Sequence, residues 1–203
     1  MIAVITGDII NSRKLPDGWI NVLKNALTSL KGKEKKWEIF RGDSFQIELN
    51  AEDALLYAIY IKACIKTLKS GDVRMGVGLG KKNINAIKVS EANGEAFINS
   101  GKAFDNLKAT RVNLAFVTPW PEFDEEINLY VRLSLIAMDN WGVVAAEMVK
   151  YAIENDGMKQ DKIAEISGRS QSSVSEALKR AYYTEILALE EKYRDKISNL
   201  IKK

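Results

Sequence analysis

Two aspartates, Asp8 and Asp43, each follow a glycine in a stretch that otherwise has the pattern of a β-strand. Asp8 lies near the end of the apolar run IAVITGDII, and Asp43 lies between the two alternating runs of WEIFRGDSFQIEL. Two carboxylates at neighbouring strand ends repel each other unless a cation or a proton lies between them. Oxygen ligands suit Mg²⁺, which proteins often bind together with nucleotide phosphates. The pair therefore predicts a metal or nucleotide site; the alternative is that each aspartate only caps a turn beside its glycine.

Three arginines are close enough in sequence to contact the anionic part of such a ligand, namely Arg13, Arg41 and Arg74. A guanidinium group binds phosphate or carboxylate oxygens with two parallel hydrogen bonds. The chain has no histidine, which excludes histidine metal ligands and the Ser-His-Asp and Cys-His pairs of hydrolases. Any catalysis would depend on carboxylates, lysine, tyrosine or a bound metal.

A second group of residues suited to binding is the stretch SQSSVSEALKRA, which begins at Ser170. Serine is a poor former of helix interiors, so a helix that served stability alone has little reason to begin in this way. Short hydroxyl side chains keep a helix slim enough for the DNA major groove, glutamine can pair with adenine, and basic side chains attract phosphates. The predicted DNA contacts are Ser170, Gln171, Ser172, Ser173, Ser175, Lys179 and Arg180.

The elements that would position this stretch are three helices, predicted over 145–155, 159–167 and 170–182. Gly168 can adopt the left-handed conformation that a tight turn needs, and Ser170 can cap the last helix. Two short helices joined by such a turn predict a helix-turn-helix that binds duplex DNA. Residues 158–203 carry ten basic and seven acidic side chains, while the rest of the chain is balanced. The alternative is a solvated helix in a packed bundle.

The first part of the chain alternates strands and helices in the order β-α-β-β-α-β, followed by a helix and a strand. This order predicts an α/β (α+β) fold with a ferredoxin-like arrangement. The pattern becomes wholly helical after Pro119-Trp120-Pro121. We therefore predict a palm-like α/β domain over 1–118, a connector helix over 119–143 and an all-α helix-turn-helix region over 144–203.

The last helical stretch, YYTEILALEEKYRDKISNLI, carries one apolar stripe. The stripe has two interpretations: it packs on the helix-turn-helix core, or it forms the seam of a homodimer that reads two half-sites. Its members are Ile186, Leu189, Tyr193, Ile197 and Leu200.

Composition limits the environment in which this chain works. The single cysteine, Cys64, cannot form an intrachain disulfide. The first residues place their charge after the apolar run, unlike a secretory signal, and no uncharged stretch approaches the roughly 20 residues of a membrane helix. We expect a cytoplasmic protein that is not inserted in a membrane.

Three short motifs in the first part resemble the palm of class III nucleotidyl cyclases: GDII, GDSF and RMGVGLG. The resemblance implies that Asp8 and Asp43 hold metal ions. Cyclases carry a glycine-led helix with an asparagine and an arginine for the transition state; laid on GEAFINSGKAF from Gly94, these positions hold Ile98 and Lys102. The departure implies a degenerate nucleotide- or metal-sensing domain, with Lys102 as a further ligand contact, rather than a cyclase.

The stretch IAEISGRSQSSVSEALKRA resembles the helix-turn-helix of bacterial regulators, with Ser167 and Arg169 where apolar residues are usual. Over nearly its whole length, through MIAVITGDIINSRK, RGDSFQ, NGEAF and the C-terminal serines, the chain resembles the SatD-type proteins of bacteria, which are described as transcriptional regulators. We therefore expect a sequence-specific DNA-binding regulator that works as a homodimer on double-stranded DNA. The alternative is a metal-dependent nucleotidyl-transfer or cyclase-like enzyme that uses Asp8 and Asp43.

Overall fold

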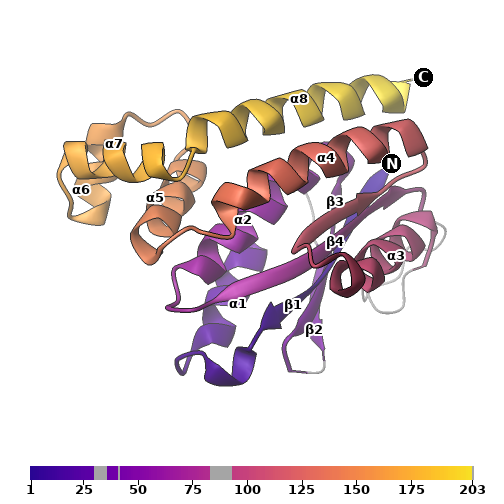
Figure 1. The fold of residues 1–203 in the computed structure, drawn as a ribbon, viewed down its shortest axis with the longest axis horizontal. Helices are drawn as coiled ribbons and strands as arrows, with labels where there is room; N and C mark the ends of the chain where they lie inside the picture. Colours follow the sequence, from indigo (N-terminus) through magenta and orange to yellow (C-terminus); the bar gives the residue numbers. More distant parts are fainter. Residues whose placement is uncertain (30–35, 41, 83–92, 203) are drawn as a thin grey trace.

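A computed structural model describes residues 1–29, 36–40, 42–82 and 93–202. Its strands form one sheet of order β2-β3-β1-β4-β5 (Figure 1), in which only β4 and β5 pair in parallel. The strands are β1 (Ile2–Ile10), β2 (Lys36–Phe40), β3 (Ser44–Asn50), β4 (Asp72–Gly80) and β5 (Leu114–Val117). The predicted central strand and the predicted hairpin are both confirmed.

Ten helical segments accompany the sheet in the part of the chain that the structure describes, so the predicted mixed α/β class is confirmed. Two are short 3₁₀ turns, η1 (Ser12–Lys14) and η2 (Ala51–Asp53). The α-helices beside the sheet are α1 (Trp19–Ser29), α2 (Ala54–Lys66) and α3 (Glu95–Thr110). Those that follow the sheet are α4 (Pro121–Met138), α5 (Val143–Glu154), α6 (Gln160–Ser167), α7 (Gln171–Arg180) and α8 (Tyr183–Lys202).

One face of β4 has no side chains where α3 packs against it. A Cβ atom added to Gly76, Gly78 or Gly80 would lie 2.0–2.6 Å from backbone atoms of α3. Because adjacent residues of a strand point to opposite faces, the other face of β4 carries four buried apolar side chains. These are Val73, Met75, Val77 and Leu79. The helix therefore seats directly on the strand backbone.

Helix α2 is the centre of the hydrophobic core. Eleven of its residues are buried, because it packs against β1 and β4 and also against α1 and α5. A single cluster of buried apolar residues runs from the sheet through α2, α4 and α5 to α7 and α8. The boundaries predicted at 118 and 143 remain predictions, and the core continues across both.

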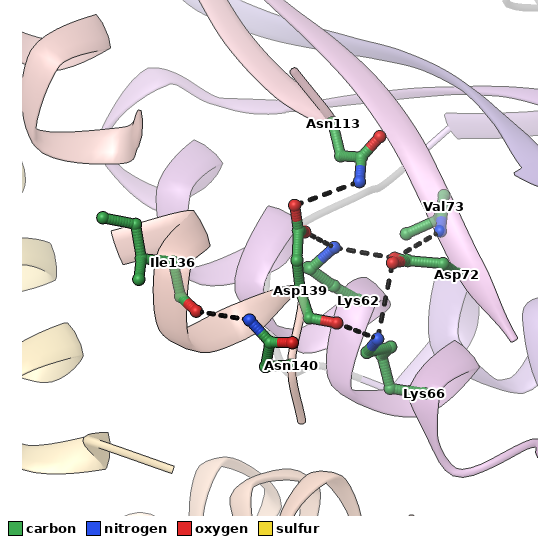
Figure 2. Close-up of polar contacts among 8 residues, drawn as sticks. All are labelled: Lys62, Lys66, Asp72, Val73, Asn113, Ile136, Asp139 and Asn140. Carbon is green, nitrogen blue, oxygen red and sulfur yellow. Dashed lines mark hydrogen bonds and ion pairs between the residues drawn. The ribbon is translucent and has the colours of Figure 1, made fainter. Parts of the chain in front are cut away.

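A buried ion-pair cluster ties the end of α4 to α2 and β4 (Figure 2). The Lys62 ammonium, whose side chain is 1% exposed, lies 2.7 Å from Asp72 and 2.6 Å from Asp139. The Lys66 ammonium donates to the Asp139 carbonyl at 2.5 Å, and the Asn113 amide donates to the Asp139 carboxylate at 3.2 Å. A buried ammonium needs paired and hydrogen-bonded partners, so the cluster fixes residue 139 relative to the sheet.

Helix α8 runs back from the α7 end of the molecule alongside α4 (Figure 1). The Tyr193 hydroxyl donates to the Ala51 carbonyl at 2.7 Å, and the Tyr193 ring packs against Phe116 and Phe123. The predicted apolar stripe is thus used inside this chain: α8 packs against η2, α7, α2 and α4, and Tyr193 also contacts Phe116 of β5. It therefore gives no support to a dimer seam, and the homodimer remains a prediction.

Candidate functional site

Helices α5, α6 and α7 form a three-helix unit at one end of the molecule (Figure 1). Gly168 ends α6 in the left-handed conformation, with φ 65°. The Ser170 hydroxyl caps α7 by accepting a hydrogen bond from the Ser173 amide at 3.2 Å. Ala164 is buried in α6, and α7 buries Val174, Ala177 and Leu178. These local predictions are confirmed, and together they fix which side of α7 faces solvent.

The outward side of α7 carries the residues predicted to contact DNA. Gln171 and Ser172 at the start of the helix, and Lys179 and Arg180 at its end, are exposed. Ser173 and Ser175 are half-buried, and Ser170 is exposed in the turn before the helix. Since α7 packs on α5, α6 and α8 alone among the major contacts, its polar row lies clear of the sheet and of α1–α3.

Two contacts of this unit were not evident from the sequence. The Arg169 guanidinium, where an apolar residue is usual, lies 3.1 Å from the Glu147 carboxylate of α5. The Gln171 amide donates to the Gln160 side chain at 3.1 Å, which joins the first turns of α6 and α7. The ion pair gives the half-buried Arg169 side chain a partner beside the Gly168 turn. The sequence could only suggest that Arg169 pairs with some acidic residue of an earlier helix. Nothing in the spacing pointed to Glu147 in particular.

The C-terminal end of α7 is held by a single indole. The Trp141 Nε1 donates to the Ala181 carbonyl at 3.0 Å in a buried setting. Trp141 follows Asp139, which the Lys62 cluster fixes to the sheet. This hydrogen bond therefore ties the C-terminal end of α7 to the loop between α4 and α5.

Asp8 and Asp43 lie close together in the pairing of β1 with β3, but their carboxylates have different partners. In the strand register Asp8 is opposite Ser44 on one side and Arg74 on the other. The Arg74 guanidinium binds the Asp8 carboxylate through two hydrogen bonds of 2.6 and 2.9 Å. The Asp43 carboxylate instead accepts a 2.7 Å hydrogen bond from the Ser12 hydroxyl. A cation at Asp8 would have to replace or rearrange the Arg74 contact.

The remaining predicted ligand contacts are dispersed. Arg13 is exposed in η1, and Lys102 is exposed on α3, as is Ile98. The buried polar residues of α3 are instead Asn99, whose amide donates to the Leu79 carbonyl at 2.8 Å, and Ser100. Arg41 lies outside the described residues. The structure thus brings Arg74 to Asp8 and leaves Arg13 and Lys102 facing solvent.

A row of half-buried polar side chains, here called the polar face, runs across β3, β1 and β4. In its centre the Gln46 amide donates to the Thr6 hydroxyl at 3.0 Å, and the same hydroxyl lies 3.0 Å from that of Ser100. The Asp8–Arg74 pair stands at one end. At the other end the Lys82 ammonium lies 2.7 Å from the Glu48 carboxylate. Thr6 and Gln46 were missed in the sequence because an alternating strand gives no sign of which polar face is covered.

Among the described residues, no group of three or more aspartate, glutamate, cysteine or histidine side chains is placed to hold a metal ion. None of the described helices combines the length and apolar character needed to cross a bilayer.

Comparison with known proteins matches the chain to one family. A search of curated proteins finds no match. The model of the SatD family matches residues 1–194, which is almost the entire sequence. The chain therefore belongs to the SatD family.

Proposed function

We propose that this protein is a sequence-specific DNA-binding transcriptional regulator that reads duplex DNA through α7. In this proposal α6 and α7 are a helix-turn-helix, and the sheet with α1 and α2 is a ferredoxin-like domain. The observation that carries it is the outward side of α7, a polar row that starts at a serine cap and ends in two exposed basic residues. A helix of this shape fits the major groove and meets both base edges and phosphates.

Binding of selected duplexes tests the proposal. Duplexes recovered from a random pool are titrated by fluorescence anisotropy at several salt concentrations. The variant Lys179→Ala/Arg180→Ala should bind all duplexes more weakly, and its log–log salt slope should fall by about 2, because each lost phosphate contact releases about one counterion fewer. Lys24→Ala/Lys108→Ala removes two exposed lysines elsewhere and should leave the slope unchanged. Equal slopes for both double variants would overturn the assignment of α7.

Gln171 separates base reading from phosphate attraction. Its side chain stands in the first turn of α7, where helix-turn-helix proteins contact bases. Gln171→Ala should cost about 1–3 kcal/mol on the selected duplex and little on unrelated duplexes. A uniform loss across all duplexes would contradict base reading by this residue.

Regulators of this type read two half-sites, so we also propose a homodimer that works in the cytoplasm, where the chromosome is accessible. Sedimentation at micromolar concentration, with and without a selected duplex, tests the dimer. A monomer in both conditions, bound one per duplex, would overturn it.

We propose the polar face as a nucleotide or Mg²⁺ sensor. The favouring observation is that the row is half-buried and its members are hydrogen-bonded to one another, whereas a sheet built only for stability would bury apolar residues there. Calorimetric titration with nucleoside triphosphates and Mg²⁺ should give binding that Asp8→Asn abolishes. An enzyme would also turn these triphosphates over, and that turnover would be lost in Asp8→Asn and Asp43→Asn. Absence of turnover across the common triphosphates would remove the enzyme alternative.

A further inference from the structure

A groove of about 580 Å³ lies beside α7, between the turn that joins α5 to α6 and the first turns of α8. Small-molecule sites usually enclose about 300–1,000 Å³ and have mostly apolar walls with a few polar groups. The groove falls within this size range, and its wall is apolar and polar in about equal parts. The apolar part is made by Ala152, Ile163, Leu178, Leu187 and Ala188.

The charges around this groove are unbalanced. Three carboxylates line it, those of Asp156, Glu185 and Glu191, against one ammonium, that of Lys179. Among the described residues none of these carboxylates pairs with a cation, which distinguishes them from the other acids of the region, such as Glu147 and Glu154. A ligand that carried a positive charge would therefore find complementary groups here.

An aromatic ring completes the lining. Tyr183 is half-buried in the groove, and burial, followed by the nearby Asp156 carboxylate, raises its pKa to about 12. The phenol thus stays neutral, and Asp156 lies close to it. A neutral tyrosine ring attracts a cation that lies over its face, so a cation bound beside Tyr183 would gain from both the ring and the Asp156 carboxylate.

We propose that this groove binds an amphipathic organic cation, whose apolar body contacts Leu178 and Leu187 and whose charge faces the carboxylates of the rim. The site itself does not depend on DNA binding. Its regulatory consequence does rest on the proposed function: Ser175 and Lys179 belong both to the groove and to the row predicted to contact DNA. A bound cation neutralises carboxylates that repel phosphate, so it should strengthen DNA binding.

Direct binding without DNA tests the site. Tetraphenylphosphonium is titrated calorimetrically into the full chain, and tetraphenylborate, of nearly the same shape and opposite charge, serves as the matched ligand. The cation should bind at least tenfold more tightly. Equal binding of both ions, or binding of neither, would overturn the proposal.

Two variants locate the ligand. Ala188→Trp fills the groove from the exposed side of α8 and should weaken the cation at least tenfold, while Ala109→Trp on the exposed side of α3 should not. Asp156→Asn/Glu191→Gln should weaken the cation several-fold and leave the borate unchanged, because only the charge is removed. Circular dichroism confirms that each variant is folded. Cation binding that Ala188→Trp leaves intact would place the ligand elsewhere and overturn the site.

A final arm separates this inference from the proposed function. With a selected duplex, tetraphenylphosphonium should raise DNA affinity about threefold, and by linkage the duplex should raise cation affinity by the same factor. If the cation binds but no duplex does, the proposed function fails and the groove stands. If both bind independently, the regulatory consequence is overturned.

Discussion

Lys62 shows what one residue contributes to the placement of a whole region. Its ammonium is enclosed by carboxylates of β4 and of the residue after α4, and its side chain is 1% exposed. A buried ion pair adds little stability over a well-packed apolar group, but removal of one partner leaves an uncompensated charge. The cluster therefore acts mainly as a specific joint, which requires residue 139 to meet α2 in one arrangement.

Lys62→Met keeps the apolar stem and removes the charge. We expect the free energy of unfolding in urea to fall by about 1–3 kcal/mol, because Asp72 and Asp139 lose their main cation. Lys66 remains 3.4 Å from Asp72, and the Asp139 side chain is 36% exposed. Lys69→Ala, at an exposed position shortly after α2, should change the free energy of unfolding by less than about 0.5 kcal/mol. Adding Asp72→Asn and Asp139→Asn to Lys62→Met should recover part of the loss; a further fall instead would contradict the joint.

A second residue, Asp124, makes stability depend on pH. One of its carboxylate oxygens accepts a 3.0 Å hydrogen bond from the Thr118 amide, and the other is buried without a partner among the described groups. Burial raises the pKa of Asp124 more than the Thr118 hydrogen bonds lower it. The folded state thus holds this proton more tightly than the unfolded chain does.

The resulting stabilisation is fully present below the ordinary aspartate pKa and is lost as pH rises through the higher folded value. Asp124→Asn cannot titrate, so this decrease in stability with rising pH should be absent from its unfolding free energies, measured in urea between pH 3 and 7. Parallel pH profiles for the two proteins would count against the argument.

At the scale of elements, the close contact between α3 and β4 allows the most direct test of the packing. Gly78→Ala would place its methyl carbon 2.0 Å from the Ser100 nitrogen and 2.2 Å from the Ala96 carbonyl. Backbone atoms cannot move aside as a side chain can, so we expect a loss of about 3 kcal/mol or more in thermal or urea unfolding.

The matched control is Gly101→Ala, inside α3 and facing open space. Alanine is the better helix former, so this variant should gain about 0.5–1 kcal/mol. A neutral Gly78→Ala would show that α3 does not seat on β4 as described.

Several elements were predictable because local rules determine them. The Gly168 turn, the Ser170 cap and the inward side of α7 follow from backbone preference and helical spacing. The path of α8 was not predictable, because an apolar stripe such as that of Tyr193 and Ile197 specifies burial but not the surface that provides it. The Asp8–Arg74 pair was missed for a related reason: a strand sequence does not say which residue stands opposite.

At the scale of the molecule, the continuous core joins the sheet region to the helices that follow it. The Tyr60 hydroxyl of α2 donates to the Glu154 carboxylate of α5 at 2.5 Å, and both helices belong to the same buried cluster. Regions that share a core unfold together, whereas two independent domains would melt separately.

Urea unfolding followed by tryptophan fluorescence and by far-ultraviolet circular dichroism should therefore give coincident transitions. Tyr60→Phe should shift both midpoints equally, with a loss of about 1–2 kcal/mol, because the lost hydrogen bond joins the two regions. Val112→Ala, at a partly buried position shortly before β5, should also shift both. Two separated transitions in any of these proteins would show that the regions are independent.

The path of α8 back along α4 has a consequence for the duplex that we propose α7 binds. Only two residues separate this helix from α7, and it spans about 30 Å. Its far half is anchored to η2 through Tyr193 and Arg194. If α7 binds DNA as proposed, this anchored helix fixes the orientation of α7 relative to the sheet. If two copies read one operator, the separation of its halves is set by the protein, and five inserted base pairs, which turn one half to the opposite side of the duplex, should abolish recognition.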